Sequence, residues 1–183
     1  MLNISGDPVP LNRDTRAVMI PAGNPVIIPE GTEVVVAQEL GGAFTIYLGG
    51  QLARIAGKDA DALGKEPTQM PELPEDATDA DVEQLVWDQM RTCFDPEIPI
   101  NIVDLGLVYR CELKKQEDGD FIAEVDMTLT APGCGMGDII AFDVKEKVEM
   151  VPRIKQANVD LTFDPPWNQS MMSDEARLKT GMY

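Results

Sequence analysis

Histidine is absent from the 183 residues of the chain. This absence excludes Ser-His and Cys-His catalysis and removes the commonest zinc ligand. Only three cysteines are present, spaced too widely for a CxxC pair, and their odd number argues against a disulfide framework. A GxxxxGK[ST] phosphate-binding loop is also missing, so an ATPase of that type is not expected.

Basic residues are scarce, because 15 Lys and Arg stand against 32 Asp and Glu, for a formal net charge of −17. Such a chain repels phosphate backbones and anionic lipid surfaces, so neither nucleic acid nor a membrane is an expected partner. No stretch approaches the roughly 20 apolar residues of a membrane span. The first residues lack a basic segment followed by an apolar one, so a cytoplasmic location is the default expectation.

Composition and periodicity divide the chain into three parts. Residues 1–65 hold short β-patterned runs separated by glycines, which predicts a small β-rich barrel or sandwich. Residues 66–78 combine prolines with acidic side chains, which is typical of an extended linker. Residues 79–183 mix helical and strand patterns and predict an α+β domain.

The second part follows an α-β-β-α-β order. Thr78 and Asp81 resemble a capping box at the start of the first helix. Apolar spacing and alternation predict these elements: a helix over 80–93, strands over 107–114 and 121–129 with a hairpin turn at 117–120, a helix over 137–150, and a strand over 158–163. Ser173 predicts the N-cap of a short last helix. The order contains a β-helix-β unit, so the last strand can lie parallel to the strand before it.

The stretch Thr-Leu-Thr-Ala-Pro-Gly-Cys-Gly-Met-Gly, residues 128–137, carries the strongest chemical signal. A strand pattern ends there, a glycine-rich turn holds Cys134, and a helix pattern begins beyond it. A thiol at a helix start faces unpaired N–H groups and the positive end of the helix dipole, which favour the thiolate. The thiolate attacks electrophiles and binds soft metals, so Cys134 is the first candidate for sulfur or iron chemistry.

Other candidates surround this turn. Asp95, Glu97 and Asp104 flank the first strand of the second part, where they supply either oxygen ligands near the Cys134 loop or turn and capping hydrogen bonds. Thr130 precedes the loop and either bonds within it or points to solvent. Cys111 and Cys93 continue apolar patterns and read as packing residues. Trp167 reads as a cover over the core or as an interface anchor.

Three motifs together resemble the MIP18 (DUF59) family, over about residues 80–183. They are the segments 95–109 (DPEIPINIVDLGLVY), 127–137 (MTLTAPGCGMG) and 163–167 (FDPPW). The front part, with QELGG at 38–42 and DADALGK at 59–65, looks like the N-terminal domain of the bacterial SufT proteins of that family. One departure is Ile154-Lys155-Gln156-Ala157, which stands where the family has a glycine turn before the last strand.

The resemblance implies an iron–sulfur cluster assembly type of fold and a non-enzymatic accessory role in iron–sulfur protein maturation. It makes Cys134 the functional thiol and iron or cluster ligand, with Gly133 among its motif neighbours. The implied cargo is transient iron or an Fe-S cluster, and the implied partners are iron–sulfur scaffold or carrier proteins and apo client proteins.

Residue chemistry agrees with a transfer role, because one thiolate grips iron weakly whereas a stable cluster takes about four cysteines. A single cysteine per chain suits transfer, or a homodimer that shares the cargo. Two other functions stay open: a cysteine-dependent enzyme whose thiol is assisted by a carboxylate such as Glu97, and a purely structural adaptor.

Overall fold

The computed structural model describes residues 6–95, 98–132 and 136–181. The chain divides into two compact units, Met1–Gln69 and Met70–Tyr183, and the division falls inside the proline-rich acidic stretch. Residues 65–78 contain no helix or strand. Each unit has its own hydrophobic core, so each is described by itself.

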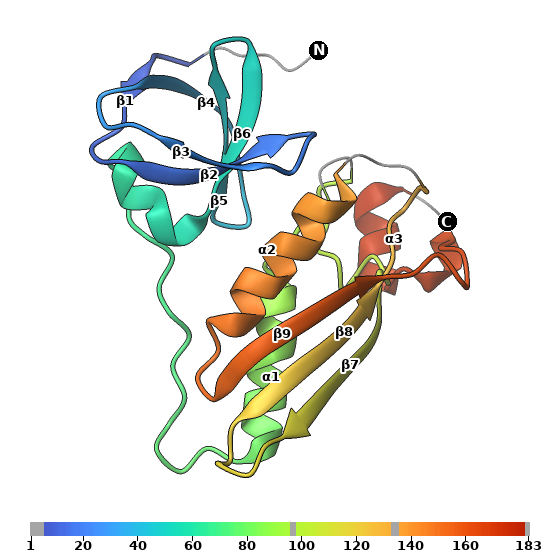
Figure 1. Cartoon of the computed structure of the whole chain (residues 1–183). Coiled ribbons are helices and arrows are strands. Elements are labelled where there is room, and N and C mark those ends of the chain that lie inside the picture. The colour runs from blue at the N-terminus through green and yellow to red at the C-terminus, as the bar shows by residue number, and fades with distance from the viewer. Residues whose placement is uncertain (1–5, 96–97, 133–135, 182–183) are drawn as a thin grey trace. The chain divides into compact units, whose positions relative to one another are not determined.

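The first unit is built on one antiparallel sheet of six strands in the order β1-β4-β5-β6-β2-β3 (Figure 1). Its elements are β1 (Val9–Pro10), β2 (Thr15–Ile20), β3 (Pro25–Ile28), β4 (Glu33–Leu40), β5 (Ala43–Leu48), β6 (Gln51–Ile55) and the 3-10 helix η1 (Gly57–Leu63). The β-patterned runs at 25–28, 32–38, 43–48 and 51–55 predicted β3 to β6, and no pattern predicted β1, β2 or η1. In β2 the neighbours Ala17 and Val18 are both buried, so the strand lacks a clean alternation.

The QELGG and DADALGK segments of this unit have structural roles. The Arg13 guanidinium holds η1 through Asp59 at 2.9 Å and Asp61 at 2.7 and 2.8 Å. A Cβ atom on Gly57 would lie 2.4 Å from the Gly42 carbonyl oxygen, so this close backbone approach requires glycine. These contacts explain both segments by packing alone.

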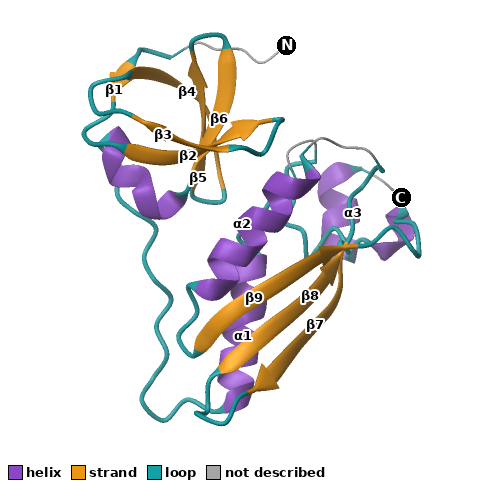
Figure 2. Cartoon of the chain, viewed as in Figure 1, coloured by secondary structure: helices purple, strands orange, loops and turns teal. Residues whose placement is uncertain are grey.

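The second unit has a three-stranded sheet with two helices on one face (Figures 1 and 2). Its elements are α1 (Asp79–Met90), β7 (Val108–Lys115), β8 (Phe121–Met127), α2 (Gly137–Glu149), β9 (Ile154–Leu161), the 3-10 helix η2 (Gln169–Met171) and α3 (Asp174–Thr180). Strand β7 pairs antiparallel with β8, and β9 pairs parallel with β8, as the β-helix-β pattern predicted. The expected mixture of helices and strands is confirmed.

The core of this unit lies between the helices and the inner face of the sheet. It joins Val82, Val86 and Met90 of α1, Val144 and Val148 of α2, and Ala123, Val125 and Met127 of β8. Lys147 interrupts the apolar stripe of α2, yet it is only 7% exposed. Its ammonium donates to the Thr92 carbonyl oxygen at 2.6 Å and lies 3.7 Å from Asp143, so a buried cation ties α2 to the end of α1.

Two element boundaries differ from the sequence prediction by three residues or more. Helix α1 ends at Met90 rather than at residue 93, although Cys93 beyond it is fully buried. Strand β9 begins at Ile154 rather than at residue 158, because Arg153 makes the preceding turn with a φ of 71°. The Arg153 side chain lies over the Phe121 ring at 5.1 Å and donates to the Gly119 carbonyl oxygen at 2.8 Å. A turn of this kind usually carries glycine, so the sequence did not show it.

Candidate functional site

Three segments of the second unit meet at one edge of its sheet. The Thr128 N–H donates to the Leu107 carbonyl oxygen at 2.8 Å, and the Thr162 N–H donates to the Met127 carbonyl oxygen at 2.8 Å. This edge therefore joins the carboxyl ends of β8 and β9 to the chain that enters β7. The turn at 128–137 leaves β8 here and enters α2 at Gly137. Open edges at the carboxyl ends of strands are common ligand sites.

Glu97, Gly133 and Cys134 lie outside the described residues, so their roles stay predictions. The flanks of the loop are described: Thr130 is half-buried, whereas Ala131 and Pro132 are exposed. Met136 is the N-cap of α2, and no side chain caps its first N–H groups. The helix thus begins at Gly137, as the sequence predicted, with its first N–H groups uncapped by the Met136 side chain.

The two described carboxylates of the predicted acidic cluster shape the loop before β7. Asp95 is 3% exposed, and its carboxylate accepts the Ile98 N–H at 2.9 Å. The Asp104 carboxylate accepts the Asn101 amide at 2.6 Å, and its backbone N–H donates to the Asn101 side-chain oxygen at 2.9 Å. Within 6–95, 98–132 and 136–181, no group of three His, Cys, Asp or Glu side chains is placed to hold a metal ion. Their described bonds are those of turn chemistry.

Residues 163–173 form a strap that is hydrogen-bonded to the segment that enters β7. The Tyr109 hydroxyl donates to the Pro165 carbonyl oxygen at 2.7 Å, and the Trp167 indole donates to that of Leu105 at 2.7 Å. The Ser173 N–H donates to the Asp104 carbonyl oxygen at 2.8 Å. Trp167 also packs against the core, which is the first of the two roles that the sequence left open for it.

Gly106 lets this strap come close. Its φ is +73°, and a Cβ atom there would lie 2.2 Å from the Met171 carbonyl oxygen. Met172 beside it is 2% exposed and belongs to the core, so it serves packing. The strap and the loop before β7 therefore form one tightly packed support next to the Cys134 turn.

Thr128 lies at the entrance to the 128–137 turn, and sequence reasoning did not single it out. It is fully buried, and its hydroxyl has no hydrogen-bond partner in the part of the chain that the structure describes. Burying a hydroxyl without a hydrogen bond costs about 1–3 kcal/mol of folding free energy, so a threonine at this position is not explained by packing. The signal available in the sequence was a polar residue directly after the core residue Met127, at the entrance to the loop.

The other two cysteines are poor nucleophiles. Cys93 is fully buried. Burial, and secondarily the charge of Glu83, raises the pKa of the half-buried Cys111 to about 11. The Cys111 thiol therefore stays protonated at neutral pH and the Cys93 thiol is shielded from solvent, so Cys134 is the candidate for thiolate chemistry.

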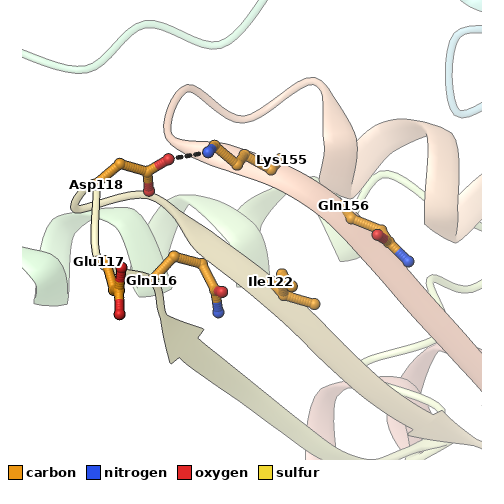
Figure 3. Close-up of a pocket in the computed structure, with 6 residues that line it drawn as sticks. All are labelled: Gln116, Glu117, Asp118, Ile122, Lys155 and Gln156. Carbon is orange, nitrogen blue, oxygen red and sulfur yellow. Dashed lines mark hydrogen bonds and ion pairs between the residues drawn. The ribbon is translucent and has the colours of Figure 1, made fainter.

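A pocket of about 540 Å³ lies at the other end of the sheet (Figure 3). The hairpin turn between β7 and β8 and the start of β9 line it, and Asp118 and Lys155 form an ion pair across its rim. Because the turn follows β7 and precedes β8, this pocket is separated from the Cys134 edge by the length of the strands.

Known proteins resemble this second unit. The sequence model of a family described as iron-sulfur cluster assembly protein matches residues 83–161. A Porphyromonas gingivalis protein named Fe-S protein maturation auxiliary factor is 49% identical over 92 residues, which are 84% of its length and 50% of this chain. The chain belongs to the iron–sulfur cluster assembly protein family. The resemblance carried by the three motifs is thereby confirmed.

One further curated relative agrees with this membership, and one solved structure is similar in sequence. Staphylococcus aureus Fe-S protein maturation auxiliary factor SufT is 41% identical over 88 residues, which are 96% of its length and 48% of this chain. A crystal structure of a DUF59 domain from Bacillus anthracis is 31% identical and covers 57% of this chain and 95% of its own, with a TM-score of 0.49. The two named relatives are about half as long as this chain, so its first unit has no counterpart of similar size in them.

None of the described helices is both long and apolar enough to cross a membrane.

Proposed function

We propose that the protein is an accessory factor in iron–sulfur protein maturation that delivers iron or an Fe-S cluster to apo client proteins through Cys134. The observation that carries this proposal is the 49% identity to a protein named Fe-S protein maturation auxiliary factor, over 84% of that protein's length. The relative from S. aureus with the same printed role adds support.

The described flanks of Cys134 support a thiolate in this role. The loop starts at the carboxyl end of β8 and finishes at the uncapped start of α2, where backbone N–H groups lower a thiol pKa. Iron or a cluster is then cargo rather than a resident cofactor, because one thiolate per chain holds it weakly enough to release. In this proposal Asp95, Glu97 or Asp104 completes a labile ligand set with the thiolate.

The names of the relatives favour a factor over an enzyme, and the missing histidine leaves only a carboxylate as base for an enzymatic thiol. The proposed partners are iron–sulfur scaffold or carrier proteins and apo clients, in the cytoplasm. The first unit is proposed to be a separate domain with no part in holding the cargo.

The test is complementation in cells that lack the native copy. Cys134→Ser keeps the size of the side chain and replaces a soft ligand with a hard, protonated one. We expect folded protein at normal abundance and loss of aconitase-type iron–sulfur enzyme activity, while Cys111→Ser complements fully. Full complementation by Cys134→Ser would favour the structural adaptor instead.

A further inference from the structure

A second surface lies beside the Cys134 loop, in the groove between α2 and β9. Its volume is about 390 Å³, and it is lined by Asp138, Ala141, Phe142 and Lys145 of α2 and by Ala157, Asn158, Val159 and Asp160 of β9. The middle of the groove is apolar, and its two walls are a helix and the edge strand of the sheet.

The edge strand offers unpaired backbone groups to this groove. The Thr162 N–H points to β8, where it donates to Met127, whereas the Ala157 N–H points away and donates to the Glu149 carboxylate at 3.0 Å. Backbone groups alternate in direction along a strand, so those of Val159 and Leu161 share the direction of Ala157. Beyond the one N–H that Glu149 covers, β9 is therefore an open template for another strand.

The two ends of the groove differ in charge. At one end Lys145 lies 3.8 Å from Glu149, so its charge is compensated within α2. At the other end Asp138 and Asp160 are exposed, and neither has an ion pair among the described residues. Asp138 lies in the first turn of α2, four residues after Cys134, so the acidic end of the groove is the end next to the thiol loop.

We propose that this groove binds an extended, basic peptide segment of a partner protein, which adds as a strand to β9 and places its Lys or Arg side chains at Asp138 and Asp160. Main-chain bonds to Val159 and Leu161 supply affinity, and the two carboxylates set the direction of the strand. The second unit carries 24 acidic and ten basic residues, which attracts a cationic segment and opposes a second copy of the same chain. A partner bound in this way would lie against the first turn of α2. The proposal extends the proposed function, but peptide binding does not require the thiol.

A defined peptide tests the proposal on the full-length chain. The probe is a capped nine-residue peptide of alternating valine and threonine with two lysines at one end, titrated into isotopically labelled protein and followed by amide NMR shifts. We expect saturable shifts confined to residues 137–145 and 156–162. N-methylation of the amides that face β9 should abolish them, whereas N-methylation shifted by one residue should leave them intact.

Charge variants complete the test. The double substitution Asp138→Asn with Asp160→Asn should weaken binding about fivefold to tenfold at low salt, since each exposed contact contributes modestly. Glu117→Gln together with Asp174→Asn removes the same charge elsewhere and should leave the affinity unchanged. A peptide with glutamates in place of the lysines should bind at least tenfold more weakly than the probe.

Three results would overturn the proposal. They are the absence of shifts at 1 mM peptide, equal binding of both N-methylated forms, and a concentration-dependent dimer that protects residues 156–162, which would make a second copy the occupant. None of them affects the Cys134→Ser complementation, so failure of this proposal and failure of the maturation role are distinguishable.

Discussion

Replacing Gly106 by alanine is expected to loosen the packing of the strap, residues 163–173, against the loop before β7. The residue has a φ of +73°, where a side chain costs roughly 1–2 kcal/mol. The new Cβ would also lie 2.2 Å from the Met171 carbonyl oxygen, so the strap or the loop before β7 must shift. Such a shift lengthens or breaks the hydrogen bonds that Tyr109, Trp167 and Ser173 donate, each of which contributes about 1 kcal/mol of stability. The expected loss is about 3–5 kcal/mol of unfolding free energy.

Gly119→Ala provides a matched control. Gly119 has a φ of +90° in the hairpin turn, and a Cβ atom there meets nothing within 4 Å. Its substitution carries the backbone cost without the clash, so about 1–2 kcal/mol should be lost. The difference between the two variants measures the contact between Gly106 and the strap.

Urea unfolding followed by tryptophan fluorescence is the assay. The chain has two tryptophans, Trp87 and Trp167, and both lie in the second unit, so the signal reports that unit alone. With a slope of about 2 kcal/mol per M, Gly106→Ala should lower the midpoint by about 1.5–2.5 M and Gly119→Ala by less than about 1 M. Equal losses in the two variants would refute the reasoning about the strap.

Four further predictions rest on the same structure. Thr128→Val should leave the unfolding free energy unchanged or raise it by about 1 kcal/mol, because it removes an unsatisfied hydroxyl. The same variant should lower maturation activity, whereas Thr128→Ser should retain it. A loss of stability in Thr128→Val would show that the hydroxyl does make a hydrogen bond. Native alkylation at pH 8 with peptide mapping should label Cys134 first and leave Cys93 and Cys111 unmodified. The rate of Cys111 labelling should rise about tenfold per pH unit up to its pKa of about 11. Equal labelling of Cys111 and Cys134 at pH 8 would contradict this. Because that pKa is raised on folding, the thiol should also lower stability as the pH rises from about 9 to 11, which urea midpoints across this range would detect. A fragment of residues 70–183 should fold alone and show the tryptophan transition of the whole chain, and an aggregated or molten product would argue against a separate domain.

Periodicity predicted most elements of the second unit, because its strands and helices bury one face each. Alternation in Phe121–Met127 and the capping box at Thr78 are both seen in the structure. The predicted start of β9, residue 158, lies four residues beyond the observed start at Ile154. The turn before β9 depends on Arg153 and on the contact of its side chain with Phe121, which no local pattern shows. In the first unit, β2 was missed because the neighbours Ala17 and Val18 are both buried, which follows from the position of β2 between β3 and β6 in the sheet.

The candidate site was predictable only where residue type and local position suffice. Cys134 followed from a strand, a glycine-rich turn and a helix in succession. Thr128 could not be singled out, because its hydroxyl becomes an anomaly only once its surroundings are known to lack a partner. The groove beside α2 likewise depends on β9 being an edge strand, which is a property of the sheet order.

The most direct test of the central claim is an anaerobic delivery assay with purified proteins. Wild-type protein, Cys134→Ala and the control Cys111→Ala are loaded with ferrous iron and sulfide, separated from free iron, and mixed with an apo iron–sulfur enzyme whose recovered activity is measured. We expect wild type and Cys111→Ala to bind iron and restore the enzyme, and Cys134→Ala to do neither although it remains folded. Equal delivery by Cys134→Ala would show that the thiol of this loop is not what carries the cargo.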